Sequence, residues 1–363
     1  MMPDVGAEEL KAIEEVIQSG QLVEGAKAHE FENLISDMAG AQFTVLCTSA
    51  TVGLELALKA LELKPDDEVL LPAFTHPATL LAVMSVGLTP VIVDVDKKTF
   101  NTNIALLEKG LSPKSKVLMP VSWGGYPIDT EVIMSFAKKH DLYVIEDAAC
   151  AIGTSYRGNK TGSQAHMTVY SFHPRKLIAL GDGGAISTND EMLHKKLKKL
   201  KHFGSETIEG KTSFVEVGGN FRLSNILAGL GIPQIKRLKE TIAAREKKAT
   251  YYNKIFSGHD WVDIPFVSSE MVSNYQSYCL SFNVPGLRDF CLERLRSIGI
   301  EVQFGTYSID RQPVCKNVRK VNDLSNSHFL GDNLLTIPLH HKITDEDQDK
   351  VFEEVKRCFQ DFK

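Results

Sequence analysis

Hydrophobic and polar positions along the first two thirds of the chain predict helices and strands in alternation. Residues 7–19 predict an amphipathic helix, with Leu10, Ile13, Val16 and Ile17 on one face. Short apolar runs predict buried strands at 43–47, 68–71, 89–93 and 116–121, and each is followed by a helical pattern. This alternation is typical of an α/β protein with a mostly parallel sheet and right-handed crossovers.

The pattern changes near residue 239, where a long helix rich in Lys, Glu and Ala is predicted. Beyond it, short strands and helices are mixed, with strands predicted at 278–284 and 300–304 and helices at 288–297 and 345–359. We therefore expect a large domain over residues 1–240 and a smaller α+β domain over residues 241–363. The N-terminal helix is free to pack against the smaller domain.

Composition narrows the classes of function. The 363 residues are 43% hydrophobic and 24% charged, which is ordinary for a globular enzyme, and the net charge of −5 gives no basic field for nucleic acid. None of the six cysteines forms a CxxC pair, so we expect no metal site and no disulfide framework. We see no signal peptide and no apolar run of membrane-spanning length. The expectation is a cytoplasmic enzyme that binds neither nucleic acid nor membrane.

One lysine stands out by its position. A predicted strand at 167–172 leads into a turn that carries Lys176, and a glycine cluster follows at 181–184. Another predicted strand ends at Asp147. Both residues therefore lie at carboxyl ends of strands, where open α/β sheets bind ligands. Pyridoxal phosphate (PLP) needs a Lys amine for a Schiff base and an acid that keeps the pyridine nitrogen protonated, so the pair predicts a PLP site.

Each of these residues also has an ordinary interpretation. A single Lys after a strand is usually a solvated loop residue, and an Asp there is usually a helix cap. The same holds for Thr48, Ser49 and Ala50, which join a predicted strand to a helix and predict either a plain N-cap or a phosphate site. A phosphate site is favoured because the Lys–Asp pair already points to PLP, and Ser171 can add a hydroxyl to it.

Seven segments together resemble the DegT-type PLP-dependent sugar aminotransferases, from about residue 20 to the C-terminus. They are CTSA (47–50), DEVLLPAFT (67–75), PVIVDVD (90–96), VIEDAA (144–149), SFHPRK (171–176), GDGGA (181–185) and GNFRL (219–223). The fourth and fifth segments are highly specific when they occur together at this spacing.

The resemblance implies the aspartate aminotransferase-like fold, PLP fold type I. Its large domain has a mostly parallel seven-stranded sheet flanked by helices, and its C-terminal α+β domain is smaller. The resemblance also implies a homodimer with active sites at the subunit interface. Asn220, in the Gly-x-Asn-x-Arg segment, then reaches the phosphate of the neighbouring subunit's cofactor.

Site roles follow from the same resemblance. Lys176 is expected to carry PLP covalently and to move the proton during catalysis, while Asp147 pairs with the pyridine nitrogen. Thr48, Ser49 and Ser171 match phosphate-binding positions, next to Ala50.

Two positions differ from the usual pattern. His76 stands where the family usually has an aromatic residue stacked on the PLP ring, and an exposed loop His is the competing interpretation. Cys150 stands three residues after Asp147, where the family commonly has Gln or His in contact with the cofactor. A buried Cys is a poor hydrogen-bond donor, so contacts to the ring hydroxyl are left open.

The expected function is a PLP-dependent aminotransferase that moves an amino group from glutamate or glutamine to a keto-sugar. The sugar is expected to be nucleotide-linked, and the pathway to be the synthesis of amino sugars, polysaccharides or glycans. Alternatives of the same fold are a sugar dehydratase, a lyase resembling cysteine desulfurases, and a cyclitol aminotransferase. Relatives that dehydrate have His in place of the lysine, so Lys176 favours transamination. A non-catalytic protein that binds PLP or sugar and regulates is the remaining class.

Overall fold

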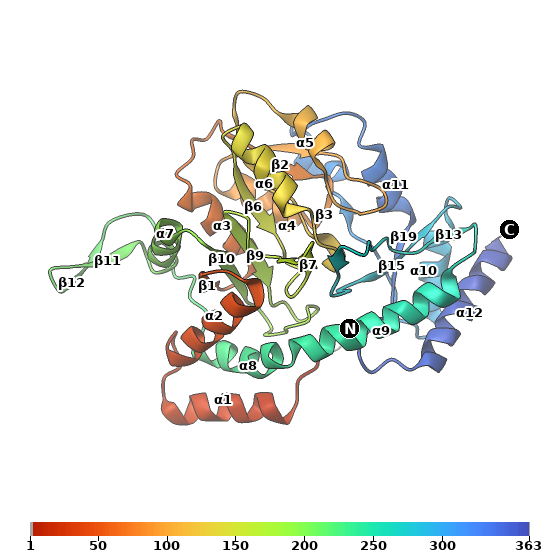
Figure 1. Ribbon diagram of the computed structural model, residues 1–363, viewed down its shortest axis with the longest axis horizontal. Helices are drawn as coiled ribbons and strands as arrows, with labels where there is room; N and C mark the ends of the chain where they lie inside the picture. Colours follow the sequence, from red (N-terminus) through yellow and green to blue (C-terminus); the bar gives the residue numbers. More distant parts are fainter. Residues whose placement is uncertain (1–2, 363) are drawn as a thin grey trace.

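The computed structural model describes residues 3–362 and contains two sheets of more than three strands (Figure 1). The larger sheet has eight strands in the order β1-β10-β9-β6-β5-β2-β4-β18. Their bounds are β1 Phe43–Cys47, β10 Gly184–Thr188, β9 Met167–Ser171, β6 Tyr143–Asp147, β5 Ser115–Leu118, β2 Glu68–Pro72, β4 Thr89–Val93 and β18 Arg319–Lys320. The predicted fold class is confirmed, with one additional short strand at the edge of the sheet.

Most of this sheet is parallel. β9, β6, β5, β2 and β4 pair in parallel, whereas β10 is antiparallel to both β1 and β9. Because β10 is antiparallel to both of its neighbours, β1 runs in the same direction as β9 and β6. The carboxyl ends of β1, β6 and β9 therefore meet at one edge, together with the start of β10.

Helices cover both faces of the sheet. They are α1 Ala7–Ser19, α2 Ala26–Ala39, α3 Ala50–Ala60, α4 Pro77–Ser85, α5 Ile104–Gly110, α6 Thr130–Lys139, α7 Glu191–Lys201 and α8 Asn225–Lys236. Successive side chains of a strand point to opposite faces of the sheet, as the pleat requires. Val169 packs in the core with Leu54 of α3, whereas Tyr170 packs in the core with Phe31 of α2.

The long helix α9, Leu238–Phe256, runs from α8 to the C-terminal part of the chain, residues 257–362 (Figure 1). This part contains an antiparallel sheet in the order β13-β15-β19-β16, covered by helices. The bounds are β13 Val262–Asp263, β15 Tyr278–Phe282, α10 Leu287–Ser297, β16 Gln303–Phe304, α11 Ser325–Asn333, β19 Leu334–Ile337 and α12 Asp345–Phe362.

Short strand pairs connect distant parts of the chain. β18 returns from the C-terminal part of the chain to pair in parallel with β4, and β17 Tyr307–Ser308 pairs with β3 Phe74–Thr75. β7 Ser155–Tyr156 pairs with β8 Asn159–Lys160 and β14 Met271–Val272. A separate hairpin, β11 Ser205–Ile208 and β12 Lys211–Phe214, projects from the body (Figure 1).

The predicted N-terminal helix matches α1 in its bounds, but its apolar face is only partly buried. Val16 is buried, and a Cβ added to Gly229 of α8 would lie 3.2 Å from its Cγ2. Leu10 and Ile17, expected on the same face, are 70% and 60% exposed. Within residues 3–362, no helix combines the length and apolar character needed to cross a membrane.

Candidate active site

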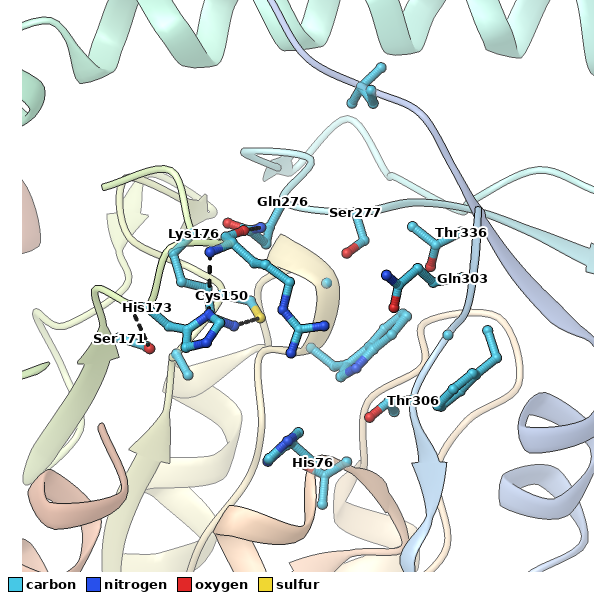
Figure 2. Close-up of a pocket in the computed structure, with 18 of the residues that line it drawn as sticks. His76, Cys150, Ser171, His173, Lys176, Gln276, Ser277, Gln303, Thr306 and Thr336 are labelled. Carbon is cyan, nitrogen blue, oxygen red and sulfur yellow. Dashed lines mark hydrogen bonds between the residues drawn. The ribbon is translucent and has the colours of Figure 1, made fainter. Parts of the chain in front are cut away.

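A cavity of about 830 Å³ opens at the edge where β1, β6 and β9 end (Figure 2). Of the residues singled out from the sequence, seven line it: Ser49, Ala50, His76, Asp147, Cys150, Ser171 and Lys176. The C-terminal part of the chain supplies the opposite wall, which includes Gln303, Thr306 and Thr336. The parallel strand order explains this convergence, because segments far apart in sequence leave the sheet at one edge.

Asp147 ends β6 as a carboxylate that is only 5% exposed. Thr79 Oγ1 donates to its Oδ2 at 2.7 Å, and the Ala149 amide donates to its Oδ1 at 3.1 Å. Burial raises the pKa of this carboxyl group, and the Thr79 hydrogen bond opposes that shift. No Lys, Arg or His among residues 3–362 forms an ion pair with it within 4 Å, so both oxygens are oriented by neutral donors.

Lys176 lies in the turn after β9 and is partly buried. Its Nζ donates to Cys150 Sγ at 2.9 Å, drawn as a dashed line in Figure 2. The turn itself is closed by the Lys176 amide, which donates to the His173 carbonyl at 2.8 Å. Cys150 thus contacts the side-chain amine that is expected to carry the cofactor.

The amino end of α3 faces the cavity. Ser49 is its N-cap and accepts from the Val52 amide at 3.2 Å, while Ala50 and Thr51, in the first turn, line the cavity. An N-terminus of this kind presents backbone N–H groups and a partial positive charge. Gly184 of β10 permits the close approach of this turn, since a Cβ there would lie 2.5 Å from the Ser49 carbonyl carbon.

His76 is exposed at the cavity and caps α4. Its Nδ1 accepts a hydrogen bond of 3.2 Å from the Ala78 amide, and its ring meets the Tyr307 ring edge-on at 6.1 Å. Burial, followed by the nearby Lys176 charge, lowers the pKa of His76. A neutral imidazole suits both the cap and a stacking surface, so the ring-stacking role stays a prediction.

Two residues singled out from the sequence lie outside the cavity lining of their own chain. Thr48 is half-buried before the Ser49 cap, and Thr51 lines the cavity instead. Asn220 is exposed, and its Oδ1 accepts from Arg222 Nε at 3.0 Å.

Sequence reasoning missed Glu146, whose side chain is fully buried behind the site. Ser122 Oγ, which belongs to a cavity-lining residue, donates to Glu146 Oε1 at 2.6 Å, and Oε2 has no hydrogen-bond partner among residues 3–362. Burial raises the pKa of Glu146 to about 7. Within the described chain, no cluster of three or more His, Cys, Asp or Glu side chains could hold a metal ion.

Comparisons with known proteins agree with this geometry. A family model described as the DegT/DnrJ/EryC1/StrS aminotransferase family matches residues 3–356. A GDP-perosamine synthase from Caulobacter vibrioides is 35% identical over 325 residues, covering 89% of this chain and 87% of the relative. The spore coat polysaccharide biosynthesis protein SpsC from Bacillus subtilis is 31% identical, covering 98% and 95%.

Solved structures give the same result. The putative sugar aminotransferase Spr1654 from Streptococcus pneumoniae, in its PLP form, superimposes with a TM-score of 0.93 at 25% identity. The match covers 99% of this chain and 98% of that one. A PMP form of the same protein gives the same TM-score.

Proposed function

The chain belongs to the DegT/DnrJ/EryC1/StrS aminotransferase family, whose members depend on PLP, and we propose that it transfers an amino group from glutamate or glutamine to a nucleotide-linked keto-sugar. The product is an amino sugar used in polysaccharide or glycan synthesis. The observation that carries this proposal is the convergence of Lys176, Asp147 and the amino end of α3 on one cavity. A cytoplasmic location stays a prediction.

The residues present fit PLP. Asp147 is buried without an ion-pair partner among the described residues, and a protonated pyridine nitrogen would supply the missing positive charge. Ala50 and Thr51 open α3 at the cavity, and Ser171 also lines it, so their N–H and hydroxyl groups suit a phosphate. Lys176 supplies the amine for covalent attachment.

When bound, PLP supplies a carbonyl carbon that amines attack and a ring that delocalises the resulting electron pair. Asp147 would hold a proton on the ring nitrogen, and Thr79 fixes the orientation of the Asp147 carboxylate. Lys176 Nζ accepts and returns the proton at the substrate carbon. Cys150 holds that amine in place while it is free, through the 2.9 Å contact with its Sγ.

The C-terminal wall suits a sugar with a charged carrier. Gln303, Thr306 and Thr336 present amide and hydroxyl groups of the kind that bind sugar hydroxyls. Arg175 and Lys350 also line the cavity with exposed side chains, and their positive charges suit phosphate or carboxylate groups.

We propose further that the working unit is a homodimer with shared sites. Asn220 is exposed and does not line its own cavity, so a second copy can receive it. The neighbouring hairpin β11–β12 projects from the body, and exposed apolar residues lie at its end and just after it. Phe214 is 72% exposed and Val217 is 92% exposed, which favours burial against a partner.

Mass spectrometry of the product tests the substrate class. The holoenzyme is incubated with a panel of nucleotide-linked keto-sugars and, in separate reactions, with glutamate or glutamine that carries nitrogen-15 in its α-amino group. We expect one sugar to gain a labelled amine in place of its carbonyl oxygen, with the Lys176→Ala protein as the inactive control. Loss of a hydroxyl without nitrogen gain would favour a dehydratase, and labelling of a cyclitol ketone alone would favour a cyclitol aminotransferase. No turnover despite bound PLP would favour a non-catalytic binder.

A further inference from the structure

We propose that Gln276 is a positioning residue for Lys176, an amide clamp that fixes the peptides on both sides of the lysine. This role rests on the proposed function, because it assigns the chemistry to Lys176. Gln276 precedes β15 and is 5% exposed, so its side-chain amide is buried where the C-terminal part of the chain meets the loop after β9.

Both ends of the amide are used on the same loop. Gln276 Nε2 donates to the Arg175 carbonyl at 2.6 Å, and the Leu177 amide donates to Gln276 Oε1 at 3.2 Å. The two bonds bracket Lys176 in the sequence, and Figure 2 shows Gln276 directed at the turn that carries it. Two hydrogen bonds from one planar group restrict both translation and rotation of the loop that carries Lys176, whereas a single hydrogen bond would leave the loop free to rotate.

The clamp is itself held rigidly. Asn274 Oδ1 accepts from the backbone N–H of Gln276 at 2.9 Å, and Asn274 Nδ2 donates to the backbone carbonyls of Cys150 and Ile152, each at 2.9 Å. Asn274 therefore fixes the loop that carries Cys150, the partner of Lys176, while Gln276 fixes the loop that carries the lysine. A Cβ on Gly125 would lie 1.9 Å from Asn274 Oδ1, so a glycine is needed at that position.

The long helix α9 anchors this arrangement. Arg245, which is 4% exposed, donates from Nε to the Tyr275 carbonyl at 3.0 Å and from Nη2 to the Gln276 carbonyl at 3.1 Å. Burial lowers the pKa of Arg245 to about 10, so its guanidinium stays charged at neutral pH. A series of hydrogen bonds therefore runs from Arg245 of α9 through residues 274–276 to the loop that carries Lys176. These bonds link the position of the C-terminal part of the chain to the position of the Lys176 amine.

The fold provides a matched control. Gln234 of α8 is 4% exposed and makes the same pair of bonds on Ala179: the Ala179 amide donates to its Oε1 at 2.8 Å, and its Nε2 donates to the Ala179 carbonyl at 3.1 Å. Both glutamines therefore hold the loop after β9, but only Gln276 brackets the lysine. A purely structural role predicts equal consequences for the two.

The test compares Gln276→Met with Gln234→Met, which remove the amide with little change in volume. In the full chain we expect faster hydrogen exchange at Leu177 in Gln276→Met and at Ala179 in Gln234→Met. In the holoenzyme, kcat should fall roughly 10- to 100-fold in Gln276→Met, as a displaced reacting group implies. The pH midpoint of the cofactor's visible absorption should also shift, whereas Gln234→Met should keep both close to those of the parent.

Gln276→Glu keeps an acceptor for the Leu177 amide and loses the donor to Arg175. It should preserve the Leu177 protection and restore part of the lost kcat. If Gln276→Met does not fold, the comparison of Gln276→Glu with Gln234→Glu decides, and an unchanged kcat and absorption midpoint in Gln276→Glu overturn the clamp. Equal kcat losses in the two Met variants, or unchanged Leu177 exchange in Gln276→Met, overturn it as well. A covalent cofactor adduct at another lysine would instead refute the proposed function, whatever the exchange at Leu177.

Discussion

Thr79 Oγ1 donates a 2.7 Å hydrogen bond to Oδ2 of Asp147, on the carboxylate that borders the cavity. Thr79 also contacts Thr75 Oγ1 at 2.9 Å, and it is fully buried in the first turn of α4. Its hydroxyl favours the charged form of Asp147 and fixes one of its two oxygens. The other oxygen accepts from the Ala149 amide, so the carboxylate is held ready for a cationic partner.

Replacing Asp147 by Asn should slow amino transfer far more than it weakens PLP binding. Without the carboxylate the ring nitrogen would lose its proton and the ring would delocalise electrons less well, which predicts a loss of roughly 100-fold or more in the rate of the glutamate half-reaction. Stopped-flow absorbance measures that rate, and fluorescence titration of the apoprotein measures PLP affinity. Thr79→Val, which keeps the carboxylate, should lose much less. Near-normal half-reaction rates in Asp147→Asn would mean that the residue only stabilises local structure.

Cys150 should be the first cysteine that alkylating reagents modify. All six cysteines lie within residues 3–362, and Cys150 alone is not buried. Iodoacetamide on its sulfur would place a bulky group against Lys176 and abolish activity. Peptide mass mapping combined with residual activity follows the reaction. Cys150→Ala loses the 2.9 Å contact with Lys176 and should be less active than the parent, but its remaining activity should resist the reagent. Equal inactivation of Cys150→Ala would show that the damage occurs elsewhere.

Glu146→Gln should stabilise the protein more at pH 8 than at pH 5. The folded pKa of Glu146 is about 7, above its usual value of 4.5, so the folded state holds an extra proton between these values. The parent's stability therefore falls as pH rises through this window, by on the order of 3 kcal/mol. The Gln side chain does not ionise, so the variant avoids this loss of stability. Urea unfolding at pH 5 and pH 8 measures the free energy of unfolding of both proteins. An equal difference between them at the two pH values would contradict the raised pKa of Glu146.

Two inactive proteins, Lys176→Ala and Asn220→Ala, should complement each other when mixed. In a shared-site dimer, one site of each heterodimer carries both lesions and the other carries neither. Differently tagged subunits, co-purified after reassembly, show that exchange has occurred, and activity per heterodimer is then measured. We expect about half the parental activity, as one intact site in two implies. Verified heterodimers without activity, or an active monomer, would place Asn220 in the packing of its own subunit.

The sequence predicted the elements that depend on local pattern. The strands 43–47 and 89–93 match β1 and β4 in their bounds, because each is an apolar run between turn residues. It did not predict that residues 184–188 would run antiparallel between two strands, or that 319–320 would join the large sheet. These pairings depend on contacts between distant segments, which a local pattern does not encode.

The same limit applies to the site. Lys176 and Asp147 could be identified because both were predicted at the carboxyl ends of strands, and the structure brings both to one cavity. Thr79 and Gln276 could not, since a Thr in an apolar helix and a Gln in a polar loop are ordinary at the level of sequence. Their importance arises only when the fold places them 2.7 Å from Asp147 and 2.6 Å from the Arg175 carbonyl.

Borohydride reduction of the holoenzyme tests the central claim most directly. Reduction makes the bond between PLP and its lysine permanent, and peptide mass mapping then locates the adduct. The account predicts one phosphopyridoxyl group on Lys176, no adduct in Lys176→Ala, and protection from reduction once glutamate has converted the cofactor to its amine form. An adduct on a different lysine, or a PLP-loaded protein that yields no adduct, would contradict it.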